Sequence, residues 1–276
     1  MLAIRTTFGL CLLAAVAAAL SSCARAPREH LTLAGSTSLQ PVTERWADAY
    51  RARRPDVFVS VQGGGSTAGV RAALEGAAQI GLSSRALTPA ESSRLSVVAV
   101  ARDGIVLVVH PENPVRDLTL RDLRAIYAGN VRDWSSLRGR AARITAITRE
   151  EGSGTRAAFE QLVMAGQTIA NSTLVQDSAG AVRQMVGSDP AAIGYISIGL
   201  VDATVKALRL DGVTANEASI DASDYPLVRP FLFVLPRVRD AKAADFLAWV
   251  MGPEGHALLR QEGLLPPSAE GPHAGR

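Results

Sequence analysis

Four short loops rich in glycine, serine and threonine contain the residues of this sequence that could bind a small anion. The loops span Gly35–Ser38, Gly63–Thr67, Ser83–Arg85 and Arg149–Thr155. All four follow a predicted strand and three precede a predicted helix, which is where an open α/β sheet binds its ligands. Free N–H groups and the positive end of a helix favour negative charge there, and serine and threonine add hydroxyl donors.

One such loop alone would indicate no more than a helix cap after a glycine turn. Four loops together with Arg149 and Arg85 indicate a binding site. The planar guanidinium of Arg149 can contact two oxygens of one ligand. Many neutral donors with one or two arginines therefore predict a site for a small, dehydrated oxyanion.

The elements that must position these loops alternate between strands and helices, which indicates an α/β protein. Expected strands lie at residues 31–34, 57–61, 79–83, 105–109, 144–148, 192–198 and 231–235. Helix patterns lie between them; in the first, Leu39, Val42 and Trp46 fall on one face. The apolar stretch 97–109 is expected to be broken at residues 102–104, which read Arg-Asp-Gly.

Two strongly apolar strands, 105–109 and 231–235, flank the middle section of the chain. This arrangement predicts a discontinuous lobe 1 (31–108 plus 231–265) and a lobe 2 (109–230) that are joined by two crossings. Such a connection forms a hinge with a ligand cleft between the lobes.

The N-terminus predicts export. Arg5 precedes an apolar run from Leu10 to Leu20, which has the length of a signal peptide and is too short to span a bilayer. The sequence Leu20-Ser21-Ser22-Cys23 resembles the lipobox of bacterial lipoproteins, in which the cysteine carries diacylglycerol. We therefore expect a signal peptide (1–22), a lipidated Cys23 with a tether (23–30), and a flexible tail (266–276). The alternative is an ordinary secretory signal with a chance cysteine.

Composition excludes several classes of function. The only cysteines are Cys11 and Cys23, so the expected mature domain has no thiol for catalysis or metal binding. The formal charge of +3 becomes +2 (3 − 1) once Arg5 leaves with the signal, and aromatic residues make up only 5% of the chain. This mild, scattered charge gives no support for nucleic-acid binding. We expect a monomer without a metal or cofactor.

The loop residues also resemble a known family, the phosphate-binding proteins of phosphate ABC transporters. The matching segments occur in the order and spacing of that family: 35–38, 63–66, 80–85, 120–134, 148–155 and 193–195. The resemblance covers essentially the whole expected mature chain, and the Arg149–Thr155 loop is its most specific part. It implies a two-lobed type II periplasmic-binding-protein fold that buries inorganic phosphate between its lobes and delivers it to permease subunits from the periplasmic or extracellular face of a membrane.

The resemblance also implies roles for particular residues. Backbone and hydroxyl donors would come from Thr37, Ser38, Ser66, Ser153, Gly154 and Thr155, with Ser36 and Arg85 as secondary candidates. Arg149 would pair with phosphate and be held by Glu151.

One position departs from the family's best-described pattern. Where that pattern has an aspartate that accepts the proton of monohydrogen phosphate, this chain has Ser84 followed by Arg85. A serine can accept that proton but repels sulfate far less than a carboxylate does. A receptor for sulfate, molybdate or tungstate is therefore an alternative.

Enzymatic interpretations are weaker. A phosphatase or serine hydrolase would use Ser153 or Ser66, but Glu151 and Ala68 interrupt the Gly-x-Ser-x-Gly pattern that such nucleophiles require. The pair Glu150–Glu151 could suggest acid–base catalysis, although a role of Glu151 in orienting Arg149 is the better interpretation. A dinucleotide site at Gly63-x-Gly65-x-x-Ala68 lacks the acidic residue expected about twenty positions on.

Overall fold

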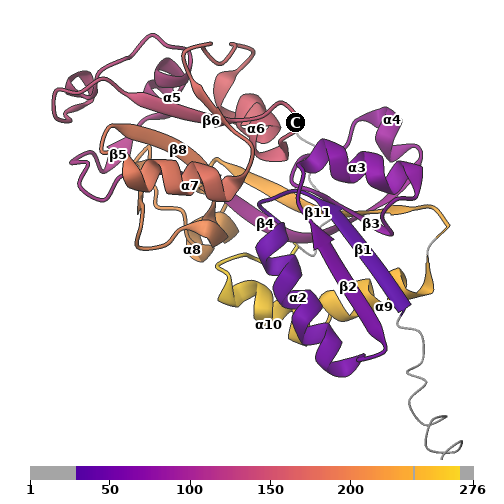
Figure 1. The fold of residues 1–276 in the computed structure, drawn as a ribbon. Coiled ribbons are helices and arrows are strands. Elements are labelled where there is room, and N and C mark those ends of the chain that lie inside the picture. Colours follow the sequence, from indigo (N-terminus) through magenta and orange to yellow (C-terminus); the bar gives the residue numbers. More distant parts are fainter. Residues whose placement is uncertain (1–28, 239, 268–276) are drawn as a thin grey trace, which may run out of the picture.

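The computed structural model describes residues 29–238 and 240–267. The predicted signal peptide, Cys23 and most of the predicted tail lie outside these residues. In the described part, nine strands form one curled sheet in the order β2-β1-β3-β11-β4-β8-β6-β7, with β9 beside β4. Helices cover the sheet in two groups, which Figure 1 shows on either side of β4 and β11.

The first group, here called lobe 1, begins with three parallel strands and two crossover helices. Its elements are β1 (Glu29–Gly35), α2 (Gln40–Arg53), β2 (Val57–Gln62), α3 (Ser66–Glu75), β3 (Ile80–Ser83) and α4 (Pro89–Ser92), with α9 (Ala241–Val250) and α10 (Pro253–Gln261) from the C-terminal part. The pairs β1–β2 and β1–β3 are parallel, so their carboxyl ends lie at one edge of the sheet. The loops of 35–38, 63–67 and 83–85 therefore share that edge, as predicted.

The second group, lobe 2, contains the elements between the two long strands. They are β5 (Asp117–Leu118), α5 (Leu120–Tyr127), η1 (Trp134–Leu137), β6 (Thr145–Arg149), α6 (Gly154–Phe159), η2 (Glu160–Met164), β7 (Leu174–Gln176), α7 (Ala179–Ser188), β8 (Ala192–Ser197), η3 (Ile198–Leu200), β9 (Lys206–Ala207), β10 (Arg209–Leu210) and α8 (Glu217–Asp221). Strand β6 is parallel to β7 and β8, and it ends at Arg149. The fourth predicted loop thus begins at the carboxyl end of a strand.

Two long strands, β4 (Leu95–Val109) and β11 (Val228–Pro236), connect the lobes. Strand β4 pairs with β11 up to Gly104 and with β8 from Ile105 onward. The expected break at residues 102–104 is wrong, because the strand continues through them. The buried carboxylate of Asp103 is stabilised inside the sheet because Arg229 of β11 lies directly opposite and forms an ion pair with it.

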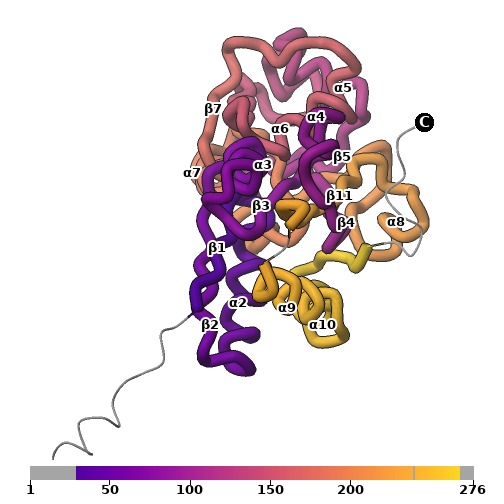
Figure 2. Tube along the Cα trace, turned by 90° about the vertical axis from the view of Figure 1, so that its right-hand side faces the viewer, coloured from indigo at the N-terminus to yellow at the C-terminus, as the bar shows by residue number. Residues whose placement is uncertain are grey.

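Separate apolar cores fill the two lobes. In lobe 1, one face of the sheet packs on α2, α9 and α10 through Trp46, Phe233 and Phe246, and α3 covers the other face through Val70. Figure 2 shows α9 and α10 beside α2. In lobe 2, Tyr127, Phe159 and Tyr195 centre one core and α7 covers a smaller one. The loops with candidate site residues lie where these two sets of packed elements meet.

Candidate functional site

Lobe 1 brings its predicted serines together at the carboxyl edge of the sheet. Ser36 and Ser38 follow β1, Ser66 begins α3, and Ser84 follows β3; all four are at most 4% exposed. The hydroxyl of Ser36 donates to Ser84 Oγ over 2.9 Å, and Ser66 Oγ lies 3.3 Å from the same atom. The Ser84 N–H donates to Ser66 Oγ at 3.0 Å. The result is a small buried cluster of hydroxyl groups.

Backbone donors accompany these hydroxyls at the start of α2. Among the described residues, the N–H groups of Thr37 and Ser38 have no hydrogen-bond partner in the protein. They belong to the turn that leads into a 14-residue helix. The positive end of that helix favours an anion at these N–H groups.

Lobe 2 contributes the loop between β6 and α6. Arg149 is 1% exposed, and Ser153 and Thr155 are equally buried. Ser153 caps α6, since its Oγ accepts a hydrogen bond from Arg156 N at 3.2 Å. The oxygen of Ser153 therefore helps to shape the loop, while its O–H group can still donate to a ligand.

Contacts between the lobes join these groups into one site. Ser38 Oγ and Thr155 Oγ1 share a hydrogen bond of 2.9 Å, and Arg149 Nη2 donates to Thr37 Oγ1 at 3.1 Å. A backbone bond of 3.1 Å from Thr67 N to the carbonyl of Gly152 lies beside them. The structure thus brings the eight principal candidates predicted from the sequence to one place.

Gly154 shows how closely the two lobes approach. A Cβ atom at this position would lie 2.2 Å from Ser66 Oγ and 2.6 Å from Ser84 Oγ. Both distances are far below van der Waals contact, so glycine is required for this approach of the two lobes. The same geometry places the Gly154 backbone against the hydroxyl cluster of lobe 1.

The carboxylate that holds Arg149 is Glu150 and not Glu151, which corrects the prediction. Arg149 donates from Nε to Glu150 Oε2 and from Nη2 to Glu150 Oε1, each at 2.9 Å. Backbone carbonyls of Gln176 and Asp177 accept further bonds from the guanidinium at 3.3 and 3.4 Å. Glu151 is exposed at the turn of the loop, so its side chain faces solvent while that of Glu150 turns back to Arg149.

Arg85, the secondary arginine candidate, lies at the margin of the site with its guanidinium already engaged. It forms two 2.9 Å bonds to the Glu91 carboxylate and a longer contact of 3.4 Å to Thr67 Oγ1. The Arg85 hydrogen bonds lower the pKa of Glu91 to about 2. The ion pair fixes Arg85 to α4 rather than directing it at the serine cluster.

The arrangement can bind an oxyanion by hydrogen bonding. Neutral hydroxyl and N–H donors dominate, one guanidinium carries the charge, and burial strengthens each charge-assisted bond. Nowhere in the described ranges do three His, Cys, Asp or Glu side chains gather in a group that could hold a metal ion. Within the same ranges, no helix has the length and apolar composition needed to cross a membrane.

Comparison with known proteins assigns the chain to a family. Residues 21–254 match the PBP superfamily domain. The phosphate-binding protein PstS of Bacillus subtilis (strain 168) is 32% identical over 201 residues, which covers 71% of this chain and 67% of that protein. The chain belongs to the PstS family. PstS of Pseudomonas aeruginosa is 28% identical over 268 residues and covers 86% of the chain.

Solved structures show the same fold. A candidate phosphate ABC transporter substrate-binding protein from Clostridium perfringens, solved with bound phosphate, has 35% identity and a TM-score of 0.85, and covers 87% of this chain and 100% of its own. An ABC-type phosphate transport receptor from Vibrio cholerae has 34% identity and a TM-score of 0.71, with 86% and 100% covered. The predicted α/β, two-lobed type II periplasmic-binding-protein fold is thereby confirmed.

Three groups at the site of this PstS-family chain were not predicted from its sequence. Thr148 and Tyr195 share a 2.6 Å hydrogen bond behind Arg149, and burial raises the pKa of Tyr195 to about 12. The Ala179 N–H at the start of α7 donates to Thr37 Oγ1 at 3.3 Å. The third group is the buried pair of Asp103 and Arg229. In the sequence, Arg229 stands out only as a charged residue beside the apolar run that forms β11.

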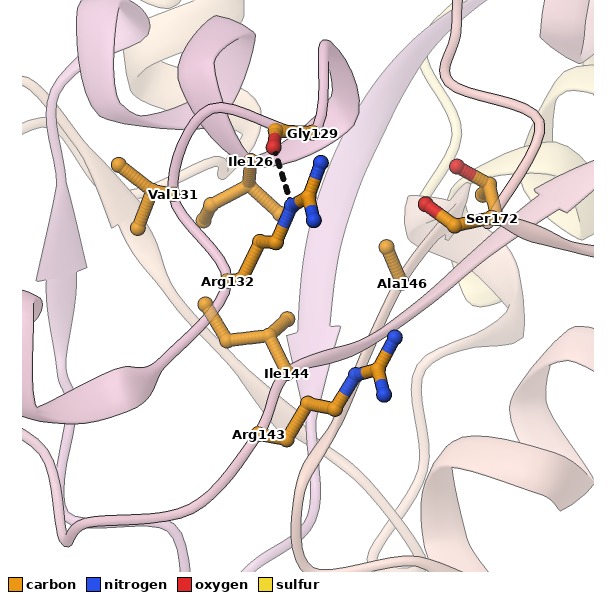
Figure 3. Close-up of a pocket in the computed structure, with 9 residues that line it drawn as sticks. Ile126, Gly129, Val131, Arg132, Arg143, Ile144, Ala146 and Ser172 are labelled. Atoms are coloured by element: carbon orange, nitrogen blue, oxygen red, sulfur yellow. Dashed lines mark hydrogen bonds between the residues drawn. The ribbon is translucent and has the colours of Figure 1, made fainter.

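A separate small pocket of about 50 Å³ lies in lobe 2, away from the PstS-family site. Figure 3 shows Arg132 and Arg143 at its sides with Ile144 between them, and Ile126 beside Arg132. Both arginines are exposed, and Arg132 Nε is bonded to the carbonyl of Gly129 at 2.7 Å. Because it lacks converging buried donors, this pocket does not compete with the serine-rich site as the place of oxyanion binding.

Proposed function

We propose that this protein captures inorganic phosphate outside the cytoplasm and delivers it to the permease subunits of an ABC transporter. The observation that carries the proposal is the buried set of donors from two lobes, which meet at the 2.9 Å contact between Ser38 and Thr155. Arg149 supplies the positive charge within this set. The related protein from Clostridium perfringens, 35% identical, holds phosphate.

Binding proceeds in this proposal by closure of the lobes around the anion. Lobe 1 (31–108 plus 231–265) presents the N–H groups of Thr37 and Ser38 with the hydroxyls of Ser38, Ser66 and Ser84. Lobe 2, whose elements lie between β4 and β11, adds the Arg149 guanidinium and the loop of Ser153, Gly154 and Thr155. Bending of β4 and β11 moves one lobe against the other, and closure excludes water from the charge-assisted bonds. The permease recognises the closed form.

Ser84 weakens the discrimination between phosphate and other tetrahedral oxyanions. Its Oγ accepts the Ser36 hydroxyl and leaves its own proton to donate to a ligand. A hydroxyl donor at this position tolerates fully ionised sulfate, molybdate or tungstate, which a carboxylate would repel. We infer a preference for phosphate over these anions that is weaker than in relatives with an aspartate there.

The site is proposed to bind its ligand without catalysis. Ser66 Oγ is bonded to the Ser84 backbone, and Ser153 Oγ caps α6. Within the described residues, neither hydroxyl has a histidine or carboxylate hydrogen-bond partner that could activate it as a nucleophile. A lipid on Cys23 is proposed to hold the protein, as a monomer, at the outer face of a membrane.

Isothermal titration calorimetry tests the proposal. Purified protein is titrated with phosphate, and then with phosphate in the presence of excess sulfate or molybdate. We expect saturable phosphate binding by the wild-type protein and a loss of about 10- to 100-fold or more in Arg149→Met, because at least one charge-assisted bond is removed. Arg183→Met, which removes an exposed pair with Asp202, is the matched control. Equal affinity of Arg149→Met and wild type would rule out this site.

A further inference from the structure

A buried ion pair between Arg229 and Asp103 lies where the two lobes join. The two residues face each other across β11 and β4, two positions before Ile105, where β4 changes its partner to β8. Arg229 is 3% exposed and Asp103 is fully buried. Burial lowers the pKa of Arg229 and raises that of Asp103, whereas their mutual attraction opposes both shifts.

Both oxygens of the Asp103 carboxylate accept hydrogen bonds, whereas two of the three nitrogens of the Arg229 guanidinium donate none within the described residues. Asp103 Oδ1 accepts from Ser197 Oγ at 2.6 Å and from Ile198 N at 3.3 Å. Asp103 Oδ2 accepts from Arg229 Nε at 2.8 Å. Arg229 Nη2 lies 2.8 Å from the same oxygen without hydrogen-bond alignment, and among the described residues neither Nη1 nor Nη2 has a hydrogen-bond partner. Buried charged donors without partners are costly and indicate that something else accepts from them.

The direction of the Arg229 side chain follows from the strand it belongs to. Arg229, Phe231 and Phe233 alternate onto one face of β11, and the Arg229 Cζ atom lies 5.2 Å from the Phe231 ring centre. Phe233 packs edge-on against Trp46 of α2. Because β11 is antiparallel to β3 and hence to β1, it runs in the same direction as the crossover helix α2. Moving from Phe233 back to Arg229 therefore leads toward the N-terminal turn of α2, where Ser38 lies.

Lobe 2 contributes to the surroundings of the same guanidinium. Asp103, the partner of Arg229, accepts a hydrogen bond from Ser197 of β8. Tyr195 lies two positions earlier on the same face of that strand. The charge of Arg149 also lowers the pKa of Arg229. Thr148, the hydrogen-bond partner of Tyr195, directly precedes Arg149. Arg229 thus lies on the two connecting strands, between the α2 end of lobe 1 and the Arg149 end of lobe 2.

We propose that Arg229 is a second cationic ligand of the oxyanion site, whose free Nη1 and Nη2 donors bind the anion from the two strands that connect the lobes. The inference rests on the proposed function and deepens it. Two guanidiniums, each held by its own carboxylate (Glu150 and Asp103), match a tetrahedral dianion better than a monoanion. Arg149 belongs to lobe 2, whereas Arg229 is on a connecting strand and so contacts the anion without depending on lobe closure.

Calorimetry on the purified full-length protein tests this role with three variants. Asp103→Asn/Arg229→Met removes the whole pair and so leaves no lone buried charge. Its phosphate affinity is expected to fall about 10- to 100-fold, the loss of a charge-assisted bond. Arg229→Lys keeps the pair but removes the free guanidinium donors, and is also expected to weaken binding. Asp103→Asn alone retains the Arg229 cation but removes the carboxylate that holds it, so the melting temperature without phosphate is expected to fall and the phosphate affinity to fall less than in the double variant.

The matched control is Asp221→Asn/Arg102→Met, which removes an exposed pair from the neighbouring position of β4. It is expected to bind phosphate within about twofold of wild type, as an exposed pair contributes little. Wild-type affinity in either the double variant or Arg229→Lys would overturn the inference, and a double variant that does not fold leaves Arg229→Lys to decide. If the wild-type protein binds no phosphate, sulfate or molybdate, the proposed function fails and this inference with it.

Discussion

Single residues set how closely the two lobes approach. The Gly154 backbone lies where any side chain would collide with Ser66 and Ser84, and both serines are fully buried. Beside it, Arg149 is locked to Glu150 by two bonds of 2.9 Å and reaches Thr37 with its Nη2 atom. The site therefore depends on a glycine at position 154, which has no Cβ atom, and on the fixed orientation of the Arg149 guanidinium.

Gly154→Ala is predicted to impair phosphate binding by preventing this approach. The added methyl group forces a displacement that costs about 1–3 kcal/mol, as in other overpacked interiors, which corresponds to roughly 5- to 150-fold in the dissociation constant. Calorimetry measures the change. Gly180→Ala, in the first turn of α7 with open space around its Cα, is the control and should bind as the wild type does. Unchanged affinity of Gly154→Ala would show that the lobes need not meet here.

Ser84→Asp is predicted to sharpen the discrimination between phosphate and sulfate. An acidic side chain accepts the proton of monohydrogen phosphate and repels sulfate, which has no proton to donate. We expect the ratio of sulfate to phosphate dissociation constants to rise about tenfold or more, in line with one unfavourable charge contact. Competition calorimetry at pH 7 gives the ratio, with Ser84→Asn as the neutral control. A ratio that stays the same in Ser84→Asp would mean that this position does not face the ligand.

At the scale of elements, strand ends and helix starts position the donors. Parallel strands β1, β2 and β3 deliver three loops to one edge, and β6 delivers the fourth. The short helix α4 acts differently, because its capping box and the Arg85–Glu91 pair hold the loop after β3 in place. Arg85 thus supports the position of Ser84 from outside the site.

The Arg85–Glu91 pair predicts a pH-dependent contribution to stability. The pKa of Glu91 is lowered from 4.5 to about 2 by Arg85, so the native state holds its proton less tightly than the unfolded state. The stabilisation is complete above about pH 4.5 and is lost as the pH falls to about 2. Glu91→Gln should be less stable than wild type by about 0.2–1 kcal/mol at pH 7, the range for ion pairs that reach solvent. Urea denaturation at pH 7, 4.5 and 3 should show this difference shrinking; a constant difference would contradict the assignment.

The order of elements and the location of the site were largely readable from the sequence. Apolar runs and glycine-rich loops are local signals, and every expected strand is present. Their ends are shifted by at most three residues, except that β4 begins at Leu95, ten residues before the expected strand. The continuous β4 was not predictable, because Asp103 is tolerated in the sheet only through Arg229, 126 positions away. The choice of Glu150 over Glu151 was missed for a related reason, since the turn of the loop decides which carboxylate faces Arg149.

At the scale of the whole molecule, two separately packed lobes share two continuous strands. Each lobe has its own core, so one lobe can turn against the other without breaking either. The Asp103–Arg229 pair lies on the shared strands, and the hydrogen bonds between Ser38 and Thr155 and between Thr67 and Gly152 lie where the lobes touch. An anion held there links both lobes.

Cys23→Ser is predicted to prevent lipid attachment, because serine has no thiol to form the thioether with diacylglycerol. After expression in a bacterial host, the wild-type protein should sediment with membranes and incorporate labelled palmitate. The variant should incorporate no labelled palmitate. Palmitate labelling that persists in Cys23→Ser would place the anchor elsewhere.

A crystal structure of the protein with phosphate shows whether the anion binds where the two lobes meet. We predict a phosphate ion whose oxygens accept from Thr37 and Ser38 N–H, from the hydroxyls of Ser66 and Thr155, and from the Arg149 guanidinium. Phosphate bound at another surface, with these donors still paired only to one another, would show that the two lobes do not form the binding site.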